Sequence, residues 1–343
     1  MASGQATSPS VVPLGLGTML YPAALCAFMV QHGLSKKSLS TSGAVAATVV
    51  GMGTFTHLPG VFGTVLLTFY LSSSRLTKYK AQIKKTLEED HQEGGARTAI
   101  QVFSNGATGT ALALAFQYVF WTSAQRPATL FYQDWRASTL LFAYIGHYAC
   151  CNGDTWSSEL GILSKSWPTL ITTLKKVPPG TNGGVSWIGL VASVAGGATI
   201  GAMAAVSVLV QQWREARVDL FGLIGGYLAG AAGQGQTDEM AAALRAWQMF
   251  TRAVDARFLI GLALAGAGAG LFGSLLDSLL GATVQKSNYS SKRKVITYRK
   301  EREDDDEIKA ISGWDILDNH QVNFVSSLLI AGLTGYLSWR CLW

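Results

Sequence analysis

Long apolar runs separated by short polar connections repeat along the whole chain. Eight of these runs are close to the roughly 20 mostly apolar residues that a helix needs to cross a bilayer. A ninth run, 218–233, is short and rich in glycine, which favours a re-entrant or interfacial segment. The pattern predicts an all-α fold, a polytopic integral membrane bundle of about eight spans that forms a single transmembrane domain over 1–343. The eight runs are 11–31, 40–57, 59–74, 99–121, 138–151, 185–210, 257–283 and 322–342.

The composition agrees with a membrane protein. Hydrophobic residues make up 49% of the 343 residues and charged residues only 14%, whereas soluble domains carry about 25% charged residues. The mean hydropathy is +0.25, and the 38 glycines suit helices that pack closely in a membrane. The four cysteines have no CxxC or zinc spacing, so neither a disulfide framework nor a structural metal is predicted.

The basic residues predict which loops face the cytosol. If eight runs cross and 218–233 does not, every lysine in the chain falls on one side of the membrane, and the opposite side holds arginines only. By the positive-inside rule, the lysine-rich loops are cytosolic and both termini are outside. A membrane surface then explains the net charge of +6, so membrane lipid is an expected partner and nucleic acid is not.

Three connecting segments have a distinct character. Segment 75–97 carries apolar residues at helical spacing beside lysines, which predicts an amphipathic helix on the cytosolic leaflet. There are two alternatives for this segment. It is either a solvated connector, or its lysines attract anionic headgroups or a phosphorylated substrate. Segment 211–256 is an expected insertion on the far side with no assigned chemistry. Segment 286–320 is an expected charged cytosolic loop, in which 301–307 is solvated because like charges repel.

The strongest chemical signal lies in the predicted catalytic loop 152–184. Asn152, Asp154 and Glu159 come where a helix leaves the membrane. Ionisable residues at such depth are costly and mark functional sites. Carboxylates that act together with substrate phosphates are the usual ligands of Mg²⁺. The alternative is that Asp154 caps a helix over 156–163.

A glycine-rich turn follows the acidic residues. Lys175 and Lys176 precede the segment Pro-Pro-Gly-Thr-Asn-Gly-Gly-Val-Ser, 178–186, which leads into an apolar helix. Such a turn at a helix N-terminus offers backbone N–H groups to phosphate oxygens. It is not a Walker A sequence, and a plain loop is the alternative. Together with the acidic residues, the turn favours a phosphate and metal site.

Polar residues in the last two apolar runs predict further parts of this site. Asp277 lies inside an apolar helix, about a turn and a half before its cytosolic end. It is either a second metal or nucleotide carboxylate facing Asp154, which we favour, or a hydrogen-bonded partner of a neighbouring serine. Four polar residues precede or open the final span, and they either cap it or complete the polar site. They are Asp315, Asp318, Asn319 and Asn323.

Five motifs carry a resemblance to a known family. The motifs occur in the same order as in the transmembrane protein nineteen family, which the chain resembles from about 36 to 330. This family includes the plant phytyl-phosphate kinase of tocopherol synthesis. The chain is also distantly similar to CTP-dependent dolichol kinases and CDP-diacylglycerol synthases, through the acidic motif and the PGxxGG turn. The motifs are SSSRLTKYK (72–80), HYACCNGDTWSSELG (147–161), PPGTNGGVS (178–186), GSLLDSLLGATVQ (273–285) and ILDNHQVNFVSS (316–327).

The resemblance implies a transferase of isoprenoid metabolism. It would be a Mg²⁺-dependent isoprenyl-monophosphate kinase that transfers the γ-phosphate of CTP, or of another nucleotide, to phytyl, geranylgeranyl or farnesyl phosphate and gives the diphosphate. The rivals are a cytidylyltransferase that forms a CDP-lipid and a transporter of phosphorylated lipid. The expected partners are therefore CTP, a prenyl monophosphate and membrane lipid, and a homodimer is left open. No organellar transit peptide is visible, which favours the endoplasmic reticulum with an active site facing the cytosol.

The expected site residues fall into four groups. Catalytic roles are expected for Asp154, Lys176 and Asp277, and metal ligation for Asp154, Glu159 and Asp277. The nucleotide is expected to contact Asn152, Lys175, Gly180, Thr181, Asn182, Gly183, Gly184 and Ser186. The phosphate of the lipid substrate is expected to contact Arg75, Lys78 or Lys80.

Overall fold

The computed structural model describes six stretches of the chain, and their helices follow the predicted apolar runs. The described residues are 16–55, 60–79, 96–120, 130–215, 255–297 and 308–343. The long helices are α1 (Leu16–Ser35), α2 (Thr41–Phe55), α3 (Val61–Lys78), α5 (Ala99–Val119), α7 (Trp135–Gly161), α8 (Trp187–Glu215), α11 (Ala256–Val284) and α12 (Asn319–Leu342), and α6 (Leu130–Gln133) is short. Each of the eight runs is thus helical over most of its described residues. Of the segments named above, 218–233 and 301–307, with most of 75–97 and of 211–256, lie outside the described residues.

Among the described residues, three helices are long and apolar enough to cross a membrane. They are Trp187–Arg214, Ala256–Val284 and Asn319–Leu342, while α2 is apolar but shorter. Helix α7 is longer than its apolar run because it extends at both ends of 138–151 into polar sequence. Several apolar membrane helices are therefore present, and the total of eight crossings stays a prediction.

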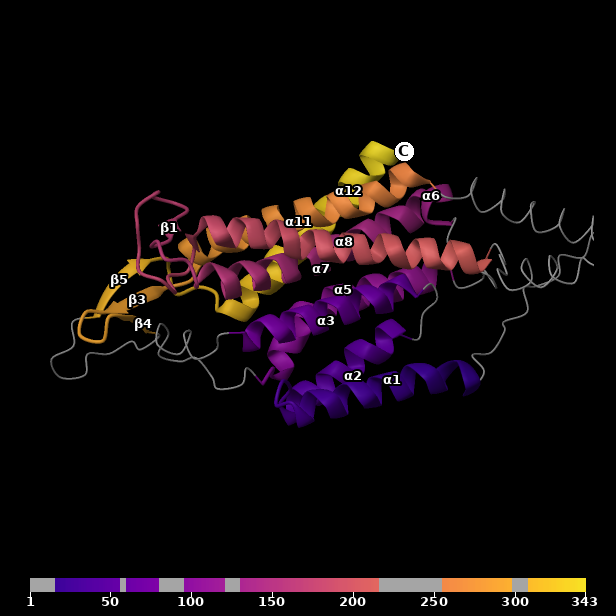
Figure 1. The fold of residues 1–343 in the computed structure, drawn as a ribbon, viewed down its shortest axis with the longest axis horizontal. Coiled ribbons are helices and arrows are strands. Elements are labelled where there is room, and N and C mark those ends of the chain that lie inside the picture. The colour runs from indigo at the N-terminus through magenta and orange to yellow at the C-terminus, as the bar shows by residue number, and fades with distance from the viewer. Residues whose placement is uncertain (1–15, 56–59, 80–95, 121–129, 216–254, 298–307) are drawn as a thin grey trace, which may run out of the picture.

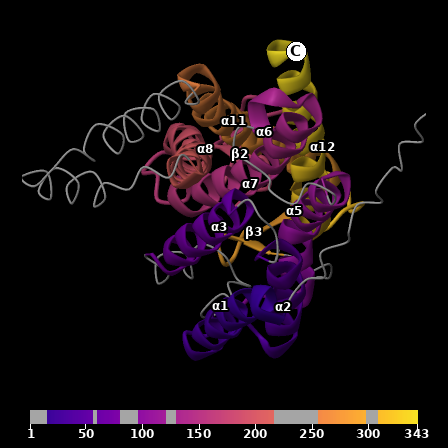
Figure 2. The same cartoon turned by 90° about the vertical axis from the view of Figure 1, so that its right-hand side faces the viewer.

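The long helices run side by side along one axis, and α7 lies in the middle of them (Figure 1). Helix α7 contacts α3, α5, α8, α11 and α12, whereas α1 packs on α2 at the edge of the bundle (Figure 2). Alternate helices point in opposite directions. As a result, the C-terminal ends of α3, α7 and α11 meet the N-terminal ends of α5, α8 and α12 at one end of the bundle, beside the strands.

The core around α7 is aromatic on one side. Tyr144 and Tyr148 are fully buried, and the ring of Tyr144 meets the Phe62 ring edge to face with centroids 4.7 Å apart. The Tyr144 hydroxyl donates a hydrogen bond of 2.7 Å to the Phe62 carbonyl oxygen. A buried hydroxyl needs such a partner, and this bond ties α3 to α7.

The opposite side of α7 is packed through glycine. A side chain at Gly153 of α7 would meet the backbone of Gly270 and Ser193, and a side chain at Gly197 of α8 would meet the Gly266 carbonyl oxygen of α11. Small residues let membrane helices approach backbone to backbone. These contacts hold α7, α8 and α11 at a fixed distance from one another.

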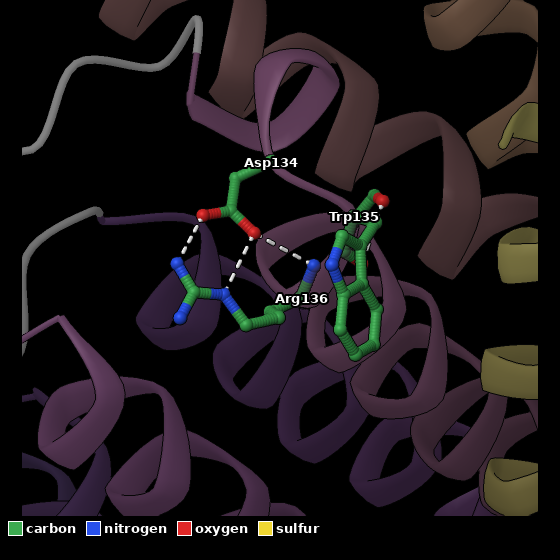
Figure 3. Close-up of polar contacts among 4 residues, drawn as sticks. Asp134, Trp135 and Arg136 are labelled. Carbon is green, nitrogen blue, oxygen red and sulfur yellow. Dashed lines mark hydrogen bonds and ion pairs between the residues drawn. The ribbon is translucent and has the colours of Figure 1, made fainter.

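An ion pair and a cap fix the start of α7. The Asp134 carboxylate accepts hydrogen bonds from the Arg136 backbone N–H at 2.8 Å and from the Arg136 guanidinium at 2.6 Å (Figure 3). The side-chain hydrogen bond and, to a lesser degree, the backbone bond hold the pKa of Asp134 below its ordinary value. From here α7 continues without a break to Gly161. Asp154 therefore lies inside a helix, and the alternative that it caps one is wrong.

Short strands interrupt the all-α prediction. Strands β1 (Thr169–Leu170) and β2 (Gly184–Val185) pair antiparallel within the loop that joins α7 to α8. Strands β3 (Ser287–Ser290), β4 (Val295–Thr297) and β5 (Ile308–Ser312) form an antiparallel sheet in the order β4-β3-β5. The expectation of a charged loop over 286–320 is thus wrong for these residues. Pairing around β3 buries its serine and asparagine side chains, which sequence polarity alone does not reveal.

Candidate functional site

A polar cleft of about 660 Å³ opens at the end of the bundle that carries the strands. The ends of α3, α5, α7, α11 and α12 line it together with the loop that joins α7 to α8. Polar side chains make up most of its lining, in contrast to the apolar surfaces of the helices, and about half of these polar side chains are charged, amide or imidazole groups. The charged, amide and imidazole side chains are Arg97, Gln101, Asn105, Asp154, Glu159, Asn182, Asp277, Gln285, Asn319, His320 and Asn323.

Two carboxylates from different helices meet in this cleft. Ser274 of α11 donates a hydrogen bond of 3.3 Å to Asp154 Oδ1 of α7. Ser274 and Asp277 are three residues apart, so they lie on one face of α11. The two carboxylates line the same cleft and interact electrostatically, so a divalent cation bound there would offset their repulsion. The structure thus brings together the two aspartates that the sequence placed 123 positions apart.

Helix α12 orients Asp277. Ser326 Oγ donates to Asp277 Oδ2 at 3.0 Å, and the Asn323 amide nitrogen, in the orientation that satisfies its neighbours, donates to the same oxygen at 3.2 Å. Asp318, in contrast, caps α12 by accepting the Gln321 backbone N–H at 2.8 Å. Of the polar residues before and at the start of α12, Asp318 therefore caps the helix, whereas Asn323 is part of the polar site.

The carboxylate pair fits Mg²⁺ that shares its ligands with a substrate. Within the described residues, no group of three or more His, Cys, Asp or Glu side chains is placed to hold a metal ion. Mg²⁺ commonly uses one or two carboxylates, with water and substrate phosphates as its other ligands. Asp154 and Asp277 match that donor set, whereas they do not suffice for a site made of protein ligands alone.

Glu159 does not join the two aspartates. Glu159 is five positions after Asp154 on α7, so its side chain is rotated by about 140° around the helix relative to that of Asp154. Glu159 lines another part of the cleft, where its charge interacts with Arg97. The predicted three-carboxylate metal site is therefore not assembled.

The glycine-rich turn lies against α11. Gly180 and Gly183 have positive φ angles of 86° and 79°, a region that favours glycine. A side chain at Gly183 would meet Ser278 and Ala282 of α11, so the turn packs within one helical turn of Asp277. Gly180, Gly183, their neighbour Gly184 and Thr181 all line the cleft.

The backbone of this turn is largely occupied. The Thr181 N–H donates to the Pro178 oxygen at 3.3 Å, and the Gly184 N–H donates to the Thr181 oxygen at 2.9 Å. The Asn182 N–H donates to Ser287 Oγ at 3.1 Å. The expectation that the turn offers its N–H groups to phosphate is therefore wrong at these three positions. Ser186 lines the cleft and caps α8 by accepting the Gly189 N–H at 3.1 Å.

The side chain of Asn182 supplies a donor instead. Its Nδ2 atom is buried and has no hydrogen-bond partner among the described residues. Asn182 lines the cleft beside Gly281 of α11. A buried amide nitrogen without an acceptor is costly, and a bound anion would satisfy it.

Three other predicted site residues lie outside the cleft lining. Asn152 is fully buried and bridges three helices, because its Oδ1 accepts from Ser72 at 2.8 Å and its Nδ2 donates to the Gly196 oxygen at 2.8 Å. Lys175 and Lys176 are exposed. Lys176 Nζ donates to the Trp167 oxygen at 2.8 Å and so stabilises the loop that contains it.

Among the described residues that line the cleft, Arg97 is the one arginine or lysine, and it is not part of the predicted lipid-phosphate set. Arg75 and Lys78 are exposed at the end of α3, where Lys78 Nζ donates to the Lys36 oxygen at 2.8 Å. Lys80 lies outside the described residues. In the sequence, Arg97 counts only as one of the basic residues on the predicted cytosolic side, because its neighbours in the sequence do not mark it as part of a site.

Sequence similarity places the chain in a known family of membrane proteins. The chain belongs to the family of integral membrane proteins designated DUF92, whose model matches residues 24–331. It is 36% identical to Protein PGR of Arabidopsis thaliana over 322 residues, which is 93% of this chain and 96% of that protein. It is 29% identical over 168 residues to an uncharacterized membrane protein of Methanocaldococcus jannaschii, covering 48% of this chain and 62% of that one. No solved structure matches the chain. The family model spans all of the cleft residues named above.

Proposed function

We propose that this protein is a Mg²⁺-dependent isoprenyl-monophosphate kinase that transfers the γ-phosphate of CTP to a prenyl monophosphate. The observation that carries the proposal is the pair of carboxylates, Asp154 and Asp277, in a polar cleft at the end of an apolar helix bundle. The motif resemblance to the transmembrane protein nineteen family suggests the reaction and its substrates.

The residues of the cleft suit phosphoryl transfer. Mg²⁺ would be held by Asp154 and Asp277, and it would neutralise charge on the nucleotide phosphates. Asn182 Nδ2 would donate to a phosphate oxygen, and Arg97 would offset the charge of the acceptor. Ser274 and Ser326 would keep the two carboxylates oriented through the bonds described above.

The reaction needs positioning more than a strong base. An oxygen of the prenyl monophosphate is already anionic, and it forms a bond to the γ-phosphorus as the bond from that phosphorus to the β,γ-bridging oxygen breaks. CDP leaves with the bridging oxygen, and the prenyl diphosphate remains. The position of the cleft at the bundle end suits a water-soluble donor and an acceptor with its tail in the bilayer. The lysine-rich loops favour a cleft that faces the cytosol, and the membrane that we propose is that of the endoplasmic reticulum.

A transfer assay with γ-labelled CTP tests the proposal. Purified full-length protein in detergent receives Mg²⁺ and geranylgeranyl monophosphate, and we expect label in geranylgeranyl diphosphate. Asp154→Asn should abolish the transfer. Asp134→Asn is the matched control, because it makes the same change at the opposite end of α7, where Asn serves as well as Asp in capping a helix.

The other outcomes identify the rivals. Label released only as pyrophosphate, with cytidine retained on the lipid, would mean a cytidylyltransferase. Counterflow of prenyl phosphate across vesicles without any nucleotide turnover would mean a transporter. Either result would overturn the kinase.

A further inference from the structure

A second cavity lies beside the cleft, and its lining is apolar. It is a narrow groove of about 90 Å³ between α1, α2, α3 and α5. Cys26 and Met29 of α1, Val50 of α2, Leu66 of α3 and Val102 of α5 are among the side chains that form its walls. The groove therefore offers hydrocarbon contacts along the helices of the N-terminal half.

The groove and the cleft share part of their walls. Phe69, Arg97, Gln101 and Asn105 line both cavities. The apolar groove thus reaches the polar cleft at a place where a cation and two amide side chains stand. Such a junction matches an amphiphile that has one apolar tail and an anionic head.

The backbone of Arg97 is anchored at this junction. The Arg97 N–H donates to the Ser38 oxygen at 3.0 Å, and the Ser40 N–H donates to the Arg97 oxygen at 3.1 Å. A side chain at Gly43 would collide with that same Arg97 oxygen, so α2 packs tightly on this segment. The position of the Arg97 backbone is therefore fixed by residues more than 50 positions earlier in the chain.

The guanidinium of Arg97 is placed by two aromatic rings. It lies 5.8 Å from the ring centroids of both Phe69 and Tyr70, within the range of cation–π attraction. Burial lowers the pKa of Arg97, and the charge of Glu159 opposes that change. Because arginine cannot be deprotonated in proteins, a half-buried cation faces the junction at all working pH values.

We propose that the groove binds the isoprenoid tail of a single-chain prenyl monophosphate and that Arg97 contacts its phosphate. This assignment rests on the proposed function, since it takes the acceptor of that reaction as its ligand. It directs the phosphate into the cleft that contains Asp154 and Asp277, with the tail running between α1, α2, α3 and α5.

Photolabelling in the absence of nucleotide locates the tail. The probe is a geranylgeranyl monophosphate analogue with a diazirine near the end of its tail, added to the full-length protein in detergent. We expect cross-links in 26–30, 47–55, 66–70 or 101–106, and we expect unlabelled geranylgeranyl monophosphate to suppress them. Cross-links confined to other helices, or cross-links that the competitor does not suppress, would overturn the groove.

Binding measurements test the head contact. Arg97→Gln should weaken binding of geranylgeranyl monophosphate at least roughly ten-fold, as expected for loss of a charge-assisted hydrogen bond, and Arg97→Lys should recover part of that loss. Binding of geranylgeraniol, which has no phosphate, should not change. Arg75→Gln is the matched control, because Arg75 is exposed at the end of α3. Equal effects of the two glutamine variants would refute the role of Arg97.

Chain length tests the groove without relying on Arg97. Ala47 lines the groove, whereas Val49 on the same helix is 55% exposed. Ala47→Phe should weaken binding of the 20-carbon monophosphate several-fold more than that of the 10-carbon one, and Val49→Phe should affect neither. Retained binding of the short ligand shows that the variant is folded. Equal weakening of both ligands would contradict the proposal.

The two proposals can fail separately, because none of these binding tests requires turnover. Groove cross-links without transfer of the γ-phosphate would keep the lipid site and reject the kinase. Transfer with cross-links elsewhere would keep the kinase and reject the groove.

Discussion

The two halves of the bundle are packed in different ways. In the C-terminal half (α7, α8, α11 and α12), a side chain at Gly197, Gly201 or Gly270 would meet backbone atoms of the neighbouring helix. In the N-terminal half (α1, α2, α3 and α5), a side chain at Gly51 or Gly106 would meet the side chains of Cys26 or Val50. Gly43, at the start of α2, differs from these two, because a side chain there would meet the Arg97 carbonyl oxygen. Backbone cannot give way as a side chain can, so the C-terminal half is the more rigid.

This difference matches the tasks that we assign to the halves. Asp154 and Asp277 stand on α7 and α11, whose separation is set by backbone contact, so the distance between the carboxylates is fixed by the fold. The apolar groove lies in the N-terminal half, where side chains form the walls and adjust to a flexible tail. Arg97 lies at the boundary between the two halves and lines both the groove and the cleft.

The largest expected effect comes from a carboxylate of the rigid half. Asp277→Asn removes a charge but keeps an oxygen that can accept from Ser326, so the bundle should fold normally. We expect transfer of the γ-phosphate to fall at least about 100-fold, because the charge stabilisation at the transferring group is lost. Binding of geranylgeranyl monophosphate in the groove should persist, which separates the two halves by function.

A matched variant lies on the same helix. Asp255 caps the other end of α11 by accepting the Phe258 N–H at 3.1 Å, and Asn is an equally good cap. Asp255→Asn should therefore retain the transfer activity of the unaltered protein. An Asp277→Asn protein with near-normal transfer would remove Asp277 from the catalytic site.

A pair of glycine substitutions tests the packing difference directly. Gly197→Ala places a methyl group against the Gly266 carbonyl oxygen and the Gly270 backbone, and overpacking of this kind costs about 2 to 3 kcal/mol of unfolding free energy. Gly51→Ala places its methyl group 2.7 Å from Cys26 Sγ, which can move. We expect a change within about 1 kcal/mol there, since alanine also favours the helix by a similar amount.

Thermal unfolding in detergent measures both variants under one condition. Gly197→Ala should lower the unfolding temperature clearly, and Gly51→Ala should leave it near that of the unaltered protein. Equal shifts for the two variants would mean that the halves do not differ in rigidity.

The sequence predicts the helices of both halves but only part of the site. Each apolar run became a helix within several residues, because length and apolarity are local properties. Asp154 and Asp277 were identifiable for the same reason, since each is an ionisable residue in an apolar setting. Arg97 was not identifiable from the sequence, because backbone hydrogen bonds to Ser38 and Ser40, in a distant part of the chain, fix its position.

Local chemistry also misleads where partners are distant. Lys176 looked like a phosphate ligand from its place before the glycine-rich turn, yet its amine is bound to the Trp167 carbonyl group. Strand β3 looked like a polar loop because its own residues are mostly polar. It is a strand because it pairs with β4 and β5, and that pairing cannot be read from the residues of β3 alone. In each case a long-range or side-chain contact decided the outcome.

A smaller effect is expected at Asn182, which lies on the loop packed against the rigid half. Asn182→Ala removes the buried donor that has no protein partner. We expect kcat/KM for CTP to fall roughly ten-fold, the value of one hydrogen bond to a charged group. The unfolding temperature should not fall, because no intramolecular bond to Nδ2 is lost. Steady-state kinetics with a melting curve checks both, and a lower unfolding temperature with unchanged kinetics would make Asn182 a structural residue.

The smallest effect is expected at the far end of the rigid half. Asp134 precedes Asp154 by 20 positions on α7, about 30 Å along the helix. Asp134→Ala removes the cap and should cost about 1 kcal/mol of stability, whereas transfer activity should not change. Because the pKa of Asp134 is lower in the folded protein than its ordinary value, its stabilising contribution is complete above the unfolded-state pKa of about 3.9.

That contribution is lost as the pH falls through the lower folded-state pKa. The difference in unfolding temperature between the unaltered protein and Asp134→Ala should therefore be constant from neutral pH down to about 5 and shrink below about 4. Melting curves across this range measure it, with Asp134→Asn retaining the cap at every pH. A difference that grows toward acid pH would show that Asp134 is not stabilised as a carboxylate. A loss of activity in Asp134→Ala would show that a disturbance travels the length of α7, so the rigid half would then transmit strain to the carboxylates it positions.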